Sequence, residues 1–382
     1  MRWLLRVLVL LGFIQTESFG LTTRACRWTM DANKADCGAF CKKVLQYHGG
    51  LIETGENYEC KLLLKCDNSR VSAKLIKGKV EFPLFEGVDT SESYLKICDR
   101  FVEKIFGTRG YFCSELVFIS DASGHPEIYT SDFLFTRVTQ WTRDRSVVLH
   151  PRWHPKGSYI VYTSYRSGYP DVYRLSLKDK KEKCLASYKG INGGACFSPS
   201  GDALVMILTM NKVPQLCLCD VKGRNVRALT KASGIKSAPV WLDEKNIIFS
   251  WANNGPSPQL FQINVERADV VKLPIAISQF ADEACVSKDG ERLFFTGASM
   301  KKLQLACLDF RTHQAQFITQ GPQDYVEPAC LADGRHVICT EKSNASKRLV
   351  LCDTVTKRII PLPCGQLKNT YQADALNYDS IN

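Results

Sequence analysis

One stretch of the sequence occurs twice in nearly the same form, as SDASGHPEIY at residues 120–129 and as SYRSGYPDVY at residues 164–173. Its proline belongs to a series with a constant interval of 44 residues, Pro126, Pro170, Pro214 and Pro258. A second series has nearly the same interval, and it consists of PRWHPKG at 151–157, ACFSPSG at 195–201, PVWLDEK at 239–245, ACVSKDG at 284–290 and ACLADG at 329–334. Two series of equal period indicate an internal repeat.

Each repeat is predicted to contain four short β-strands. An anchor residue such as Trp153 or Phe197 lies on a brief first strand, and an apolar second strand follows a turn, as at residues 159–163. Four strands in about 45 residues is the size of one propeller blade. The apolar residues alternate and lack the i, i+3, i+4 spacing of helices, which excludes a helical repeat.

Six blades are expected from the count of repeats. Five anchored units follow an upstream unit whose second strand is expected at residues 112–119. One repeat beyond Leu331 lies the segment 371–376, which we predict to complete the first blade and close the ring without a free sheet edge. The fold class is therefore mainly β, a six-bladed β-propeller over residues 111–382.

Residues 21–110 do not share the repeat and are expected to form a small α/β domain. Segments 62–65 and 71–76 are predicted strands, and 91–106 is a predicted amphipathic helix, because its apolar residues fall largely on one side. Ser91 is predicted to cap the start of this helix, and Gly107 to end it.

Residues 1–20 have the pattern of a secretory signal peptide. Arg2 and Arg6 flank the start of an apolar run over residues 7–14, and small residues, Ser18 and Gly20, precede the expected cleavage site. The apolar run is too short to span ~30 Å of hydrocarbon. An exported chain is therefore expected.

The formal net charge of +11 does not indicate a nucleic-acid partner. Lysine and arginine are scattered along the chain, and the densest run, KDKKEK at residues 178–183, falls in a predicted turn. A nucleic-acid site requires a clustered basic face. We therefore expect a solvated surface here.

The 17 cysteines divide into two groups. Within the repeats they recur in the same slots, as in Cys196, Cys285 and Cys330, which is typical of small buried hydrophobes. The six that precede the repeats are the better disulfide candidates in an exported chain: Cys26, Cys37, Cys41, Cys60, Cys66 and Cys98. No metal and no cofactor are expected, because no CxxC pair occurs and His154 is best interpreted as a polar turn residue four positions after His150.

The junction FVEKIFGTRGYFCSELVFISD at residues 101–121, followed by P-x-W-x-P-x-G repeats of the PD40, WD40-like type, resembles the TolB family of exported propeller proteins. The resemblance extends from about Leu62 to the C-terminus. The segment before Leu62 is expected to be too short and too rich in cysteine to supply a full N-terminal domain.

The resemblance implies a periplasmic protein of the Tol–Pal envelope system. It implies binding to a peptidoglycan-associated outer-membrane lipoprotein and to other Tol proteins of the inner membrane, with membrane association only through these partners. It also implies support of outer-membrane invagination and integrity during cell division.

The predicted binding site is one mouth of the central channel, where loops from every blade converge. The residues just before each innermost strand lie there, and they mix small, acidic and apolar groups. They are His150, Ile191, Gly193, Gly194, Ser237, Asp282, Glu283 and Glu327.

No enzymatic activity is expected. A propeller-type peptidase needs a further catalytic domain with a G-x-S-x-G motif, which this sequence does not contain. Two alternatives stay open: a hydrolase that uses the acidic residues Asp282, Glu283 and Glu327 at the channel mouth, and a structural propeller of a secretion assembly.

Overall fold

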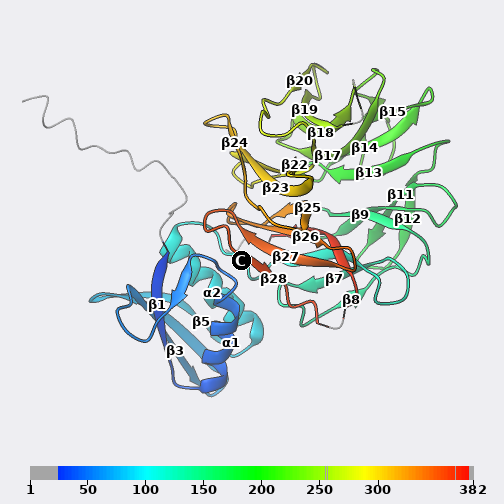
Figure 1. The fold of residues 1–382 in the computed structure, drawn as a ribbon. Coiled ribbons are helices and arrows are strands. Elements are labelled where there is room, and N and C mark those ends of the chain that lie inside the picture. The colour runs from blue at the N-terminus through cyan, green and yellow to red at the C-terminus, as the bar shows by residue number, and fades with distance from the viewer. Residues whose placement is uncertain (1–24, 254, 256, 366, 378–382) are drawn as a thin grey trace, which may run out of the picture.

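The computed structural model describes residues 25–253, 255, 257–365 and 367–377, and the predicted signal peptide lies outside them. Figure 1 shows two parts, an N-terminal α/β domain in blue and cyan and a ring of β-sheets that runs from cyan to red. In the described part of the chain, no helix has the length and apolar character that crossing a membrane requires.

The N-terminal domain is a five-stranded sheet with the strand order β2-β1-β3-β4-β5. β1 is parallel to both of its neighbours, whereas β3, β4 and β5 pair as an antiparallel meander. Both helices pack on the sheet, and the ring of Phe101 lies 5.4 Å from that of Trp28. The elements are β1 (Cys26–Ala32), α1 (Ala35–Leu45), β2 (Leu51–Glu53), β3 (Cys60–Asp67), β4 (Arg70–Lys77), β5 (Val80–Val88) and α2 (Ser91–Phe106).

Two expectations about this domain are wrong. The segment before Leu62 is not too short to build a domain, because it supplies β1, α1, β2 and the start of β3, and its cysteines all lie in the buried core of that domain. The helix at 91–106 has the predicted bounds, but its cap is Thr90, whose hydroxyl accepts from the Ser93 N–H at 3.2 Å. Gly107 ends the helix at φ 70°, as expected.

Six four-stranded sheets form the propeller, which confirms the predicted fold class. Within each blade the first strand is innermost. Blade 2 consists of β9 (Val148–Trp153), β10 (Tyr159–Ser164), β11 (Asp171–Ser176) and β12 (Glu182–Ala186). Blade 3 consists of β13 (Asn192–Phe197), β14 (Ala203–Met210), β15 (Val213–Asp220) and β16 (Arg227–Ala228). Blade 4 consists of β17 (Ile235–Trp241), β18 (Asn246–Ala252), β19 (Gln259–Asn264) and β20 (Val270–Lys272).

The ring closes as predicted, because the last strand of the chain is the innermost strand of blade 1. Blades 5 and 6 are β21 (Ala281–Val286), β22 (Arg292–Ser299), β23 (Lys302–Asp309) and β24 (Gln314–Phe317); and β25 (Asp324–Cys330), β26 (His336–Lys342), β27 (Lys347–Asp353) and β28 (Ile359–Pro361). Blade 1 is β29 (Thr370–Leu376), β6 (Glu115–Ser120), β7 (Glu127–Asp132) and β8 (Thr139–Gln140).

The second strand of each blade is apolar because both of its faces are buried. Ile247, Ile248 and Phe249 of β18, for example, are fully buried, although they point alternately to opposite faces. The apolar clusters mix neighbouring blades: Ile248 packs with Leu293 of blade 5, while Phe249 packs with Val205 of blade 3. The cluster between blades 6 and 1 also includes the core of the N-terminal domain. Adjacent blades therefore stabilise one another.

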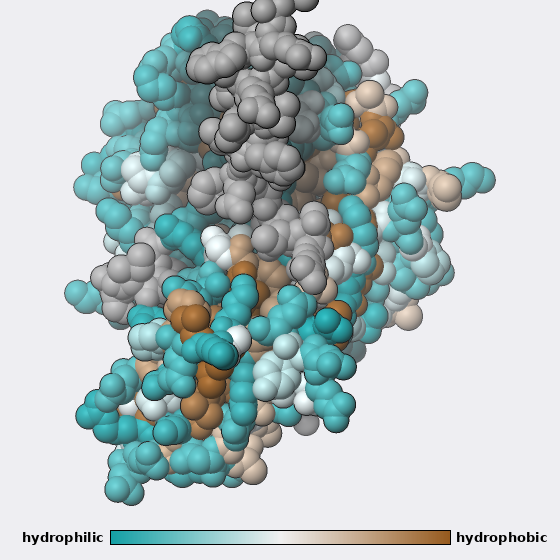
Figure 2. All heavy atoms as spheres, turned by 90° about the vertical axis from the view of Figure 1, so that its left-hand side faces the viewer, coloured by the Kyte–Doolittle hydropathy of each residue, from teal (hydrophilic) through white to brown (hydrophobic). Residues whose placement is uncertain are grey.

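The N-terminal domain docks on blade 6. The rings of His48 and His336 lie 4.7 Å apart, and the Gly49 N–H donates to Nε2 of His336 at 3.4 Å. A Cβ on Gly49 would lie 2.2 Å from the Asp353 carboxylate, so only glycine permits this approach. Figure 2 shows the outer side of this domain as mostly hydrophilic, with a narrow hydrophobic band.

Candidate partner-binding face of the propeller

Every innermost strand contains a β-bulge at the same place. In each, two residues oppose one residue of the second strand, and the first of the two has a positive φ between 46° and 60°. A single left-handed residue bends a strand and redirects its side chain. The six residues, which we call the bulge ring, are His150, Gly194, Ala238, Glu283, Glu327 and Gln372.

Hydrogen bonds connect several members of the bulge ring to the preceding blade. The Gly194 N–H donates to the Thr163 hydroxyl at 3.3 Å, and the Gln372 N–H donates to the Thr340 hydroxyl at 3.1 Å. The His150 N–H donates to the Gln372 side chain at 2.8 Å. These contacts use N–H groups that the bulge removes from sheet pairing.

The acidic part of the bulge ring lies between blades 5, 6 and 1. The Glu327 N–H donates to the Glu283 carboxylate at 3.2 Å, and the Glu327 carboxylate accepts from Lys342 Nζ at 2.9 Å and from Gln372 Nε2 at 3.2 Å. The cavity that remains among these side chains has a volume of about 10 Å³, so there is space for about one water.

The titratable groups of the bulge ring differ in charge at neutral pH. Burial, reinforced by the negative charge of Glu327, raises the pKa of Glu283 to about 7. Burial also disfavours the charged form of Glu327, but the ammonium of Lys342 lowers the pKa of that carboxyl below its ordinary value. Burial lowers the pKa of His150 to about 4, so this imidazole is neutral.

Exposed apolar side chains gather on the face of the propeller at which the innermost strands begin, here called the mouth face. In blades 2 and 3 they lie in the loops before the first strand, and in blade 2 also in the loop after the second strand. In blade 4 the first residue of β17 belongs to them. Their exposed fractions range from 36% to 72%. They are Val147, Tyr165, Tyr169, Tyr188, Ile191 and Ile235.

The loops of the mouth face are held in place by Asn192. Its buried side-chain amide donates to the carbonyls of Tyr188 at 2.7 Å and Pro170 at 3.1 Å, so it joins the loops of two blades. The N-terminal domain contacts the opposite ends of the strands, at the turn 333–335 and at residue 353. It therefore leaves the mouth face uncovered.

The structure brings together part of the predicted site. His150, Glu283 and Glu327 line the same small cavity, and Gly194 lies beside Ala238 of the next blade. Gly193, Ser237 and Asp282 immediately precede bulge residues on their strands, whereas Ile191 lies apart from them in the exposed loop before β13. Partner binding by these eight residues stays a prediction.

Sequence reasoning missed several residues of this face. Ala238 and Gln372 belong to the bulge ring. The repeat could have identified them, because Ala238 follows Gly194 by 44 residues and Gln372 follows Glu327 by 45. Tyr165, Tyr169 and Tyr188 lie in loops that the repeat defines, but their exposure cannot be derived from the spacing.

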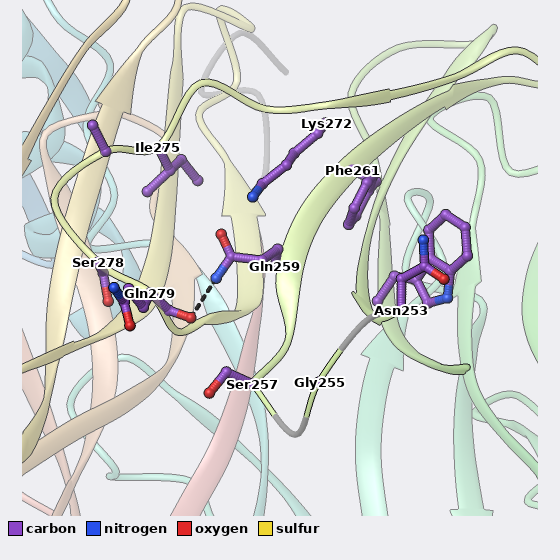
Figure 3. Close-up of a pocket in the computed structure, with 11 residues that line it drawn as sticks. Asn253, Gly255, Ser257, Gln259, Phe261, Lys272, Ile275, Ser278 and Gln279 are labelled. Atoms are coloured by element: carbon purple, nitrogen blue, oxygen red, sulfur yellow. Dashed lines mark hydrogen bonds between the residues drawn. The ribbon is translucent and has the colours of Figure 1, made fainter. Parts of the chain in front are cut away.

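A separate hollow of about 590 Å³ lies in blade 4 and the loop that follows it (Figure 3). Phe261, Gln259 and Lys272 come from its two outer strands, and the Gln259 amide donates to the carbonyl of Gln279. Among the described residues that line it, Lys272 is the only charged one, so acid–base chemistry has no pair of groups there.

Two groups in the described part of the chain offer metal-ligand atoms. One is Cys37, Cys66 and Asp89, and the other is His48, Asp333 and His336. In the second, the Asp333 carboxylate already accepts from the N–H groups of Arg335 and His336 and lies 2.5 Å from Nδ1 of His336. A direct contact this short leaves no space for an ion between these ligands.

His154 belongs to a turn, as expected. His154 follows the end of β9, its Nδ1 accepts from the Lys156 N–H at 3.1 Å, and its ring packs edge-on against Phe197. The prediction of a polar turn residue is confirmed.

Comparison with known proteins gives one family and several relatives. Residues 102–371 match the family model described as TolB beta propeller domain. The Tol-Pal system protein TolB of Desulfosudis oleivorans is 31% identical over 186 residues, which are 49% of this chain and 40% of the relative. That of Bordetella pertussis is 26% identical over 52% of this chain and 46% of the relative. The matched regions thus span less than half of these curated relatives.

The crystal structure of TolB from Acinetobacter baumannii has a similar fold. It superposes with a TM-score of 0.82 at 17% identity, over 93% of this chain and 97% of the other. An alignment of this extent includes most of the N-terminal domain as well as the propeller. The shortened N-terminal domain that we expected is therefore not observed.

Proposed function

Because the chain belongs to the family of the TolB beta propeller domain, we propose that it is a protein-binding scaffold of a Tol–Pal envelope system in the periplasm. Its direct partner in this proposal is a peptidoglycan-associated outer-membrane lipoprotein, and other Tol proteins of the inner membrane are further partners. The complex supports outer-membrane invagination and integrity during cell division. The names of the curated relatives support the assignment to the system.

The mouth face carries this proposal. Its six exposed apolar residues include three tyrosines, and aromatic side chains are enriched at the centres of protein interfaces. Because Asn192 fixes the loops beforehand, binding costs little ordering entropy. A partner of protein size that contacts loops of several blades fits this arrangement better than a small ligand does.

The acidic pair of the bulge ring gives little support to the hydrolase alternative. Glu283 and Glu327 are close enough for one to accept from the backbone of the other, but the cavity beside them has a volume of only about 10 Å³. Ligand pockets typically have volumes of about 300–1,000 Å³. A sugar or peptide therefore has no access to both carboxylates in this conformation.

The test compares two aliphatic residues of blade 4. Ile235→Asp places a charge on the mouth face, and Val271→Asp places one on the outermost strand β20; the two side chains are exposed to 63% and 61%. The probe is the periplasmic domain of a peptidoglycan-associated lipoprotein from the same genome, with binding measured by calorimetry. We expect Ile235→Asp to weaken binding about tenfold or more, and Val271→Asp to leave it unchanged.

Equal affinity of both variants and the unchanged chain would remove the mouth face as the binding site. A second set asks whether the contact reaches the channel, with bulky or opposite-charge substitutions at Gly194, Ser237 and Glu327. Unchanged binding by all three confines the contact to the outer loops. If the probe does not bind the unchanged chain at all, the proposed partner is wrong.

A further inference from the structure

The six cysteines of the N-terminal domain lie in three close pairs. Sγ of Cys26 on β1 is 3.4 Å from Sγ of Cys60 on β3. Sγ of Cys37 on α1 lies within 4.8 Å of Sγ of Cys66 at the other end of β3. The Cys98 thiol on α2 lies beside the Cys41 thiol on α1 and donates to the Cys41 carbonyl at 3.9 Å. All six side chains are buried, and every cysteine of residues 25–110 belongs to one of these pairs.

The pairing follows from the positions of the cysteines along their elements. Cys37 and Cys41 are four residues apart, so they lie on one face of α1. Cys60 and Cys66 are six residues apart, so they lie on one face of β3. Each pair joins two different elements: β1 with β3, α1 with β3, and α1 with α2.

A metal site explains this arrangement less well than disulfides do. Cys37 and Cys66 have a third potential ligand in Asp89. However, the Tyr94 hydroxyl lies among these groups, 2.7 Å from Cys37 Sγ, 3.4 Å from Cys66 Sγ and 2.5 Å from the Asp89 carboxylate. It occupies the space that a shared ion needs, whereas a bond between the two sulfurs does not displace it from Asp89.

The folded domain disfavours oxidation of these thiols, so the bonds form more readily before folding is complete. A sulfur–sulfur bond is about 2.05 Å long, so the Cys26 and Cys60 sulfurs must approach by roughly 1.4 Å. Burial raises the pKa of Cys66 to about 11 and that of Cys98 well above its ordinary value. The reactive species is the thiolate, which is therefore scarce in the folded domain and accessible only while the chain folds.

We propose that Cys26–Cys60, Cys37–Cys66 and Cys41–Cys98 form three disulfides as the chain folds, which cross-link the N-terminal domain. Each pair of thiols loses two protons and two electrons, and an oxidant of the disulfide class accepts the electrons and becomes two thiols. Formation of these disulfides in the cell rests on the export that is part of the proposed function, because such oxidants act in the compartments that exported proteins reach.

The test maps disulfides in the full chain after folding. The denatured, reduced chain is refolded in a mixture of reduced and oxidised glutathione, remaining thiols are alkylated in denaturant, and bridged peptides are identified by mass spectrometry. We expect the three named bridges. Alkylation of all six thiols in material with native circular dichroism would overturn the inference, and so would other partners for these cysteines.

Two double variants test the pairing through the bridges that remain, whatever the yield of folded protein. The double variant Cys26→Ala/Cys60→Ala should retain the other two bridges unchanged, and redistribution of those bridges would contradict a framework defined by the fold. The matched control is Cys285→Ala/Cys330→Ala, which removes a close pair, 3.0 Å apart, from the propeller. This control should leave the N-terminal map unchanged.

Failure of this inference and failure of the proposed function give different results. Refolding needs no partner and no cell, so its map decides the disulfides alone. Alkylation of thiols in intact cells then reports on export. Bridges that form in vitro while the same six thiols stay free in the cell would contradict the periplasmic location, and the chemical inference would stand.

Discussion

Single residues of the bulge ring combine a left-handed backbone with a buried titratable side chain. Glu283 and Glu327 have φ values of 48° and 58°, in a region that residues other than glycine seldom adopt. Their carboxylates and the Glu327 N–H take part in one hydrogen-bond network with Thr296, Thr340 and Lys342. The Glu283 N–H donates to the Asp282 carboxylate at 2.8 Å. The network holds the strained backbone, because strain persists only where the surrounding structure determines it.

Glu283 is expected to make the stability of the protein depend on pH. Its pKa is raised from an ordinary 4.5 to about 7, so the folded chain binds more protons than the unfolded chain between these values. The free energy of unfolding therefore decreases as the pH rises through this window. Glu283→Gln should remove the decrease, and it should raise the stability above pH 7 by roughly 1–3 kcal/mol relative to the unchanged chain.

The measurement is chemical unfolding at a series of pH values between 4 and 8. The result is the difference in the free energy of unfolding between the variant and the unchanged chain. Glu266→Gln is the control, because that carboxylate is exposed and 3.2 Å from Lys245 on the surface. A Glu283→Gln difference that stays constant across the series would show that this carboxyl does not titrate there.

At the scale of elements, the repeat period predicts strands and blades well because it reflects burial. The second strands of blades 2 to 6 begin where they were expected and extend one to three residues further. In blade 1 the strand predicted at 112–119 is β6 at Glu115–Ser120, because residues 112–114 form a turn instead. The last strand was correctly assigned to blade 1. The bulges could not be predicted from the sequence. Two residues opposite one disturb the inward and outward alternation of side chains only at the bulge itself. The strands and helix before Leu62 occur once each, so no second copy identifies them.

Gly194 tests the bulge as an element. Its φ is 60°, and a Cβ there would lie 3.3 Å from Pro239 of the next blade. Gly194→Ala should therefore lower the free energy of unfolding by about 1–2 kcal/mol. The control is Gly55→Ala, at a position with open space around the Cβ and no positive φ. Equal stability of the two variants in urea unfolding would argue against strain in the bulge ring.

At the scale of the whole molecule, the propeller depends on strand β29. This strand pairs with β6 along its length, and its residues also bond to blades 2 and 6, through Gln372 to His150 and through the Thr340 hydroxyl. Without it, β6 exposes an unpaired edge between two blades. The closing strand thus connects both ends of the propeller sequence.

Removal of β29 should reduce the stability of the propeller far more than the short length of this strand suggests. A chain that ends at Lys368 should lose the cooperative thermal transition of the propeller and associate through the exposed edge, because both neighbouring blades lose contacts. A chain that ends at Asn377 keeps β29 and should melt like the full chain. Circular dichroism and light scattering measure both effects. Retention of a single sharp transition by the shorter chain would contradict closure by this strand.

Closure by β29 also makes the finished fold a check that the whole propeller has been synthesised. The partner of β6 is made about 250 residues after β6 itself, so five blades can pair internally while the first waits for its inner strand. A product that terminates between β28 and β29 has every blade except a finished first one, and it keeps an unpaired strand edge. Only a chain that has been translated through β29 can hide that edge.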